Sequence, residues 1–129
     1  MASVYEPYNR SGNYVLERCV TSAIEQIYDK AIITSELTSC ARVRLRGSTE
    51  ERFLALHVMY APPVNRGNVC LLPDFPRLYD VSVSIKTDKD IIRVISAPDG
   101  EKLRFEKGDG RVTVYLDPFR LHKLVLLEW

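Results

Sequence analysis

Two pairs of neighbouring acidic residues are the first candidates for catalysis in this sequence. Glu50 and Glu51 are adjacent, and one residue separates Asp88 from Asp90. A catalytic pair of carboxyl groups needs surroundings that push the two pKa values apart. Both pairs fall in short polar segments between strand-like segments, where acidic residues are ordinary turn residues. We therefore predict that the chain has no catalytic residue and is not an enzyme by itself.

Histidines and cysteines are too few and too dispersed to indicate a metal site. His57 and His122 are the two histidines, and neither has a cysteine or an acidic residue beside it at ligand spacing. We expect no metal and no cofactor. His57 lies in an apolar segment and is predicted to be a hydrogen-bonded sheet residue, and His122 is predicted to bond a backbone carbonyl. A nucleophilic pair of Cys70 with His57 stays open as an alternative, although no third, orienting residue is indicated.

The cysteine count and the charge limit the cellular setting. Cys19, Cys40 and Cys70 are odd in number and far apart, which fits neither a disulfide framework nor a zinc pattern. We expect reduced thiols in a cytoplasmic protein. The net charge of +1, with acids and bases interspersed, favours no nucleic-acid partner. No apolar run approaches the ~20 residues that span a membrane, so we expect no membrane partner.

Aromatic residues around one long connection could instead bind sugar. Tyr60, Phe75 and Tyr79 flank or lie within the segment 61–76, which is rich in proline, asparagine and glycine. Connections of this length are often functional or face a partner. Aromatic rings stack on sugar faces, but they more often carry buried area in a core. A carbohydrate-binding module that uses these three rings is therefore our alternative interpretation.

A basic stripe is the other candidate surface. Arg42, Arg44 and Arg46 alternate with Ala41, Val43 and Leu45, so the arginines share one face of a half-buried strand. One interpretation is an ordinary solvated face. The sharper one is that the stripe docks on an acidic neighbouring domain.

The elements that position these residues are mainly strands. Seven or so short strand-like segments are separated by turn signals such as Pro98-Asp99-Gly100 and Lys107-Gly108-Asp109-Gly110, the last of which is expected to be a hairpin turn. This pattern predicts an antiparallel β-sandwich preceded by one amphipathic helix. The expected domains are residues 1–37, a lead-in and helix, and residues 38–129, the sandwich. The expected strands cover residues 41–46, 52–60, 79–86, 91–96, 102–105, 111–116 and 122–129.

The N-terminal segment contains the predicted helix. Residues 1–12 are expected to be irregular, and Asn13 is expected to cap a helix that runs to about residue 29. One apolar stripe recurs at helical spacing and must pack on the sandwich or on a partner chain, so a homo-oligomer is an open possibility. The stripe consists of Leu16, Val20, Ala23, Ile24 and Ile27.

Four segments together resemble the C-terminal region of certain bacterial glycoside hydrolases of the β-galactosidase or α-fucosidase type. They are LHVMYAPP at residues 56–63, LYDVSV at 78–83, RVISAPDGE at 93–101 and HKLVLLE at 122–128. The resemblance runs from about Gly12 to the end of the chain, and it depends on the order and spacing of the segments. It implies a parent with a (β/α)₈ barrel, a β-galactosidase trimerisation domain and a C-terminal β-sandwich.

The resemblance also implies what this chain does. The helix from residue 13 looks like the last helix of the trimerisation domain, and the part from about residue 38 looks like the C-terminal sandwich. The two carboxylates that glycoside hydrolysis requires would lie in the barrel. We therefore expect a non-catalytic accessory domain, either a C-terminal piece of a larger enzyme or a descendant that lost the barrel. Its partners would be the other domains or subunits of that enzyme.

Overall fold

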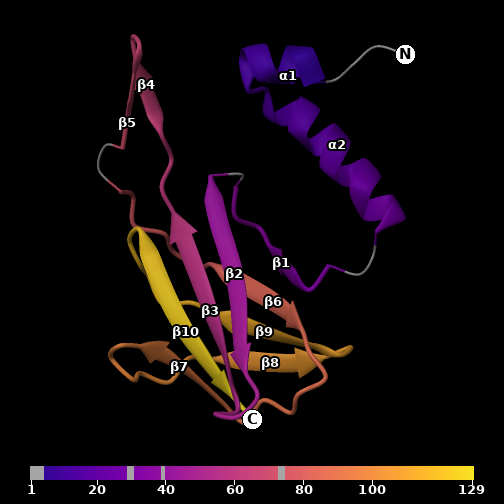
Figure 1. The fold of residues 1–129 in the computed structure, drawn as a ribbon, viewed down its shortest axis with the longest axis vertical. Coiled ribbons are helices and arrows are strands. Elements are labelled where there is room, and N and C mark those ends of the chain that lie inside the picture. Colours follow the sequence, from indigo (N-terminus) through magenta and orange to yellow (C-terminus); the bar gives the residue numbers. More distant parts are fainter. Residues whose placement is uncertain (1–4, 29–30, 39, 73–74) are drawn as a thin grey trace. The chain divides into compact units, whose positions relative to one another are not determined.

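The computed structural model describes residues 5–28, 31–38, 40–72 and 75–129. The chain divides into two compact units, Met1–Ala31 and Ile32–Trp129. The first unit holds helices α1 and α2, and the second holds all ten strands (Figure 1). The helices are α1 (Tyr5–Ser11) and α2 (Tyr14–Ile27). The strands are β1 (Ile33–Ser35), β2 (Ala41–Ser48), β3 (Phe53–Tyr60), β4 (Val64–Arg66), β5 (Val69–Leu71), β6 (Ser82–Lys86), β7 (Arg93–Ala97), β8 (Phe105–Gly108), β9 (Arg111–Tyr115) and β10 (His122–Glu128).

Two four-stranded antiparallel sheets build the second unit. One has the order β1-β6-β9-β8 and the other the order β2-β3-β10-β7. In Figure 1, strands β2, β3 and β10 cross over the sheet that contains β6, β8 and β9. The predicted fold class, a mainly β protein with an antiparallel β-sandwich, is confirmed. The predicted boundary between residues 37 and 38 stays a prediction, although β1 lies before it and pairs with β6.

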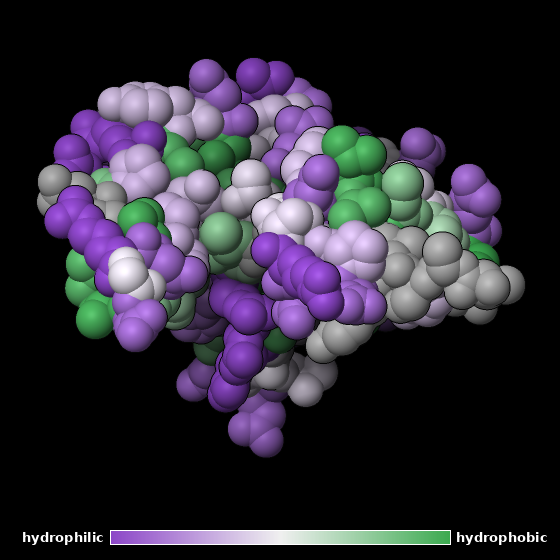
Figure 2. All heavy atoms as spheres, turned by 90° about the horizontal axis from the view of Figure 1, so that it is seen from above, coloured by the Kyte–Doolittle hydropathy of each residue, from purple (hydrophilic) through white to green (hydrophobic). Residues whose placement is uncertain are grey.

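The alternating apolar residues of both sheets form one core. Strands that are half-buried bury every second side chain, and this is the pattern that the sequence shows. The fully buried members include Leu56, Val58, Val94, Val125 and Leu127 from one sheet and Val83, Ile85 and Val114 from the other. Apolar side chains also reach the surface, and in the view of Figure 2 they lie between strongly hydrophilic ones.

The hairpin between β8 and β9 differs in detail from its prediction. Its turn is Asp109-Gly110, with φ values of 52° and 70°, and Gly108 pairs with Arg111. Positive φ at both central residues is the type I′ geometry that suits the twist of a hairpin. The hairpin is confirmed, but Lys107 and Gly108 belong to the strand. The strand begins at Phe105, and Lys102 instead bridges to Ile95.

The connection over residues 61–76 is not simply a loop. Strands β4 and β5 pair within it as a separate two-stranded ribbon. Gly67 lies in the turn between them with a φ of 61°, a conformation that glycine adopts without steric cost. All six side chains of the ribbon are exposed, so it adds nothing to the core.

The N-terminal unit has one helix more than predicted. Residues 5–11, which were expected to be irregular, form α1. Pro7 lies in its first turn, where the missing N–H has no intrahelical partner to lose. Gly12 follows with a φ of 58°, and its N–H donates to the Tyr8 carbonyl at 2.7 Å, which ends the helix.

The predicted cap of α2 is confirmed. Asn13 is extended, and its Oδ1 accepts a hydrogen bond from the Val15 N–H at 2.9 Å. The helix ends at Ile27, while its predicted end at residue 29 lies outside the described residues. No side chain of α2 is buried, and Ile24 and Ile27 of the apolar stripe are 54% and 88% exposed. No helix of the described residues has the length and apolar character of a membrane span.

Candidate functional site: the arginine face of the sandwich

The outer face of the sheet β2-β3-β10-β7 carries the most distinctive group of polar side chains. Arg42, Arg44 and Arg46 are exposed on β2, while Val43 and Leu45 pack against the core. Alternation along a strand thus puts the three arginine side chains on one face, with their Cα atoms about 7 Å apart from one arginine to the next. Strand β2 is at the edge of its sheet, so the stripe borders an open strand edge.

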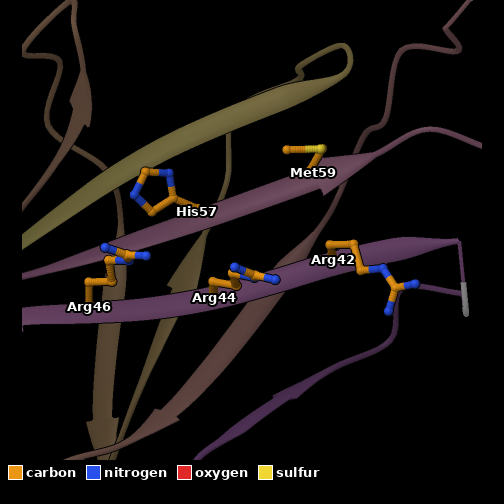
Figure 3. Close-up of a pocket in the computed structure, with 5 residues that line it drawn as sticks. All are labelled: Arg42, Arg44, Arg46, His57 and Met59. Carbon is orange, nitrogen blue, oxygen red and sulfur yellow. The ribbon is translucent and has the colours of Figure 1, made fainter.

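The neighbouring strand brings a histidine and a methionine beside the stripe. Arg44 is directly opposite His57, and Arg42 is directly opposite Met59. These five residues line a shallow pocket of about 520 Å³. Figure 3 shows Arg44 and Arg46 on β2 beside His57 on β3, with the guanidinium of Arg42 turned away from Met59. We call the surface formed by Arg42, Arg44, Arg46, His57 and Met59 the arginine face.

The two histidines of the chain meet on this face. The Nδ1 atom of His57 is 3.3 Å from the Nε2 atom of His122, and the two rings stack with centroids 5.5 Å apart. Between neutral imidazoles, one nitrogen donates and the other accepts. The prediction that His57 is a hydrogen-bonded sheet residue is therefore supported, but its partner is a side chain. His122 also bonds a backbone carbonyl, because its backbone N–H donates to the Arg120 carbonyl at 2.6 Å, while its imidazole contacts His57.

The arginine face is not neutralised from within the described chain. The side chains of Arg42, Arg44 and Arg46 form no hydrogen bond or ion pair with any described residue. Other arginines do have acidic partners, since Arg93 pairs with Glu128 at 3.5 Å and Arg104 pairs with Glu106. Guanidinium groups suit carboxylate, phosphate or sulfate groups, so three neighbouring cations without a counter-charge are a candidate surface for such anions.

The acidic candidates for catalysis lie in turns. Glu50 and Glu51 are exposed in the turn between β2 and β3. Asp88 and Asp90 lie between β6 and β7, with side chains 86% and 87% exposed, and Asp90 pairs with Lys107 at 2.6 Å. Exposed carboxylates in ion pairs are ordinary surface groups.

The cysteine and metal alternatives find no support in the described residues. Cys19, Cys40 and Cys70 are free thiols, and Cys70 forms no hydrogen bond with His57 in the part of the chain that the structure describes. Among the same residues, no three histidine, cysteine or acidic side chains are grouped closely enough to hold a metal ion.

The three aromatic candidates for sugar binding have different surroundings. Tyr60 ends β3 and is half-buried, as is Phe75 beyond the ribbon, whereas Tyr79 is 61% exposed. Tyr79 lines a pocket of about 240 Å³ together with Glu36, Asp80 and other residues, and Tyr60 and Phe75 do not line it. Sugar binding by these residues stays a prediction.

One acidic side chain of the second sheet has a shifted pKa. The carboxylate of Glu106 accepts a hydrogen bond from Arg104 and another from the Tyr115 hydroxyl at 2.9 Å. Both bonds lower the pKa of Glu106 below its usual value, and the bond from Arg104 has the larger effect. The same carboxylate raises the pKa of Tyr115. This exposed group holds β8 against β9.

Comparison with known proteins finds a similar fold within part of an enzyme. No family model matches the sequence, and no curated protein matches it. The solved structure of α-L-fucosidase isoenzyme 2 from Paenibacillus thiaminolyticus superposes with a TM-score of 0.84 and 26% sequence identity. This chain resembles part of a glycoside hydrolase. The match covers 98% of the chain and 20% of the fucosidase, so the chain spans about one fifth of the length of that protein.

Proposed function

We propose that the chain is a non-catalytic accessory domain of a glycoside hydrolase-like protein, where it braces or assembles the catalytic and trimerisation domains. One observation carries the proposal: almost the whole chain superposes on a fifth of a fucosidase. An enzyme of that size has ample room for its catalytic carboxylates in the other four-fifths. We also propose that the chain lies at the C-terminal end of that protein, as the sequence resemblance implies. Helix α2 would then be the last helix of the trimerisation domain.

The surroundings of the acidic residues support a non-catalytic role. A retaining or inverting glycosidase needs two carboxyl groups about 5–9.5 Å apart across the scissile bond, with one pKa raised. Glu50, Glu51, Asp88 and Asp90 are all exposed turn residues. The shifted carboxyl group, Glu106, has its pKa moved in the direction opposite to that of a general acid.

The first experiment tests catalysis. The purified chain is incubated with aryl α-L-fucoside and aryl β-galactoside, and release of the aryl alcohol is followed. We expect no release above the blank. Turnover that is lost in both Glu50→Gln and Glu51→Gln would overturn the proposal.

The second experiment tests the accessory role. The glycoside hydrolase-like portion that is encoded in the same reading frame or beside it is expressed with and without this chain. We expect the chain to raise the thermal unfolding midpoint of that portion or to complete its oligomer, as measured by calorimetry and light scattering. Identical stability and mass in both samples would overturn the accessory role.

A carbohydrate-binding module is the second candidate, and the exposure of Tyr79 favours it. An exposed ring beside a small pocket with carboxylates from Glu36 and Asp80 offers both stacking and hydrogen-bond acceptors to a sugar. This candidate predicts saturable calorimetric binding of a galacto- or fuco-oligosaccharide that Tyr79→Ala abolishes. Flat titrations across a glycan panel would remove it.

A further inference from the structure

The arginine face offers an open strand edge together with an unpaired charge pattern. No described strand lies beyond β2 in its sheet. An exposed edge of this kind can accept one more strand through backbone hydrogen bonds. On an added strand, side chains at alternate positions would lie directly opposite Arg42, Arg44 and Arg46. The spacing of the cations therefore matches an extended segment with acidic residues at every second position.

The positive charges of the arginine face disfavour pairing of β2 with β2 of a second copy of the chain. If two copies paired β2 with β2, arginines would lie opposite or diagonal to arginines, and like charges across strands are destabilising. Cationic side chains on an edge strand are a known protection against such pairing. An acidic segment, in contrast, would exchange this repulsion for charge-assisted hydrogen bonds. Complementarity of charge thus points to a partner of a different sequence.

The rest of the sheet face suits a protein segment better than a nucleic acid. Beyond the arginine face, the next positions across the sheet are Ala55, Leu124, Leu126 and His122. Ala55 is buried and the two leucines are half-buried, so the stripe borders an apolar surface. The net charge of the whole chain is only +1, which gives no long-range attraction to a polyanion.

We propose that the edge of β2 receives an extended acidic segment of a neighbouring domain, with carboxylates at alternate positions facing Arg42, Arg44 and Arg46. This assignment deepens the proposed accessory function and rests on it for the source of the segment. His57 lies beside the stripe and offers a further polar contact to the same carboxylates, while Met59 gives their apolar neighbours a surface to pack on. The segment would complete the sheet as a fifth strand.

The binding test uses the full chain labelled with ¹⁵N and a short synthetic peptide with glutamate at every second position and valine or threonine between. A matched peptide has glutamine in place of each glutamate. We expect the acidic peptide to shift the backbone amides of β2 and to bind about tenfold more tightly than the glutamine peptide, a difference of about 1.4 kcal/mol.

Two double variants distinguish an effect of the arginine positions on β2 from an effect of net charge alone. The R44Q/R46Q variant should lose about tenfold in affinity for the acidic peptide. The R66Q/R77Q variant removes the same charge from two exposed arginines away from β2 and should bind as the unaltered chain does. Equal affinity of the two double variants would overturn the proposal, as would amide shifts that lie outside β2 and the face beside it. Circular dichroism confirms that each variant is folded.

Three further outcomes test the ligand class and keep this inference distinct from the accessory role. If oligogalacturonate shifts the amides of β2 more strongly than the acidic peptide does, the ligand is an acidic glycan and the protein segment is excluded. If the R44Q/R46Q variant still stabilises the glycoside hydrolase-like portion fully, the docking surface is wrong while the accessory role stands. If the unaltered chain does not stabilise that portion yet binds the peptide at β2, the accessory role fails and the acidic site remains.

Discussion

Ser96 is a polar residue that is buried among the apolar side chains of the sandwich. Its side chain is 1% exposed, and its Oγ atom has no hydrogen-bond partner among the described residues. A buried hydroxyl without a partner costs about 1–3 kcal/mol of stability. We therefore expect Ser96→Ala to raise the free energy of unfolding by about 1 kcal/mol in urea titrations. Ser84→Ala is the matched control, because the Ser84 Oγ accepts from the Arg111 Nε at 2.9 Å, and it should lower stability by a similar amount. Equal losses in both variants would contradict this expectation.

Glu106 gives the stability of the chain a specific dependence on pH. Its folded-state pKa lies below the usual value of 4.5 because the ionised form accepts hydrogen bonds from Arg104 and Tyr115. The stabilisation is therefore present above the unfolded-state pKa and is lost as the pH falls through the folded-state pKa. We expect Glu106→Gln to flatten the decline of the unfolding midpoint between neutral pH and about pH 3. Glu101→Gln, whose carboxylate has no ion pair in the described residues, should leave that decline unchanged. A decline as steep in Glu106→Gln as in the unaltered chain would contradict the assignment.

The three arginines of the arginine face could be predicted from the sequence, but the contact between the two histidines could not. The alternation of Arg42, Arg44 and Arg46 with apolar residues predicts their common orientation, because the side-chain period of a strand is two. The approach of His57 to His122 could not be predicted. Sixty-five residues separate them, and their contact depends on β10 pairing with β3. Local periodicity carries no information about which distant strands pair.

Strand β3 is the element on which the sandwich most depends. It pairs with β2 on one side and β10 on the other, and Leu56 at its centre is fully buried. Replacing a buried leucine by alanine removes transfer free energy and leaves a cavity. We expect Leu56→Ala to lower the free energy of unfolding by about 2–5 kcal/mol. Val69→Ala on β5, where the side chain is 57% exposed, should change it by less than about 0.5 kcal/mol. Urea denaturation of both variants checks the contrast, and equal losses would mean that the ribbon is as important as the core.

Elements with a strong period were predictable, and short ones were not. The alternation of Val81, Val83 and Ile85 predicts the strand that becomes β6, and the apolar stripe predicts α2. The ribbon of β4 and β5 has three residues per strand and no buried face, so no alternation marks it. Helix α1 escaped prediction because Pro7 and Gly12 resemble breakers, although one fits a first helical turn and the other ends the helix.

The order of strands is a property of the whole molecule. β10, the last strand along the chain, lies between β3 and β7, and β1 joins the sheet opposite to that of β2. The sequence predicts a sandwich, but many strand orders would bury the same alternating residues. The likeness to one fifth of a fucosidase shows that this arrangement also occurs inside a larger enzyme.

The apolar stripe of α2 should make the isolated chain associate. Val20, Ile24 and Ile27 are 45%, 54% and 88% exposed, and a helix of this length is marginal in water without packing. We expect sedimentation velocity to show concentration-dependent association of the chain, with a dissociation constant that Ile24→Lys raises at least about tenfold. The control is Ile92→Lys, which introduces the same charge at a 69% exposed isoleucine of the sandwich unit and should leave association unchanged. A chain that stays monomeric at every concentration, or that responds equally to both substitutions, would mean that the stripe has no role in self-association.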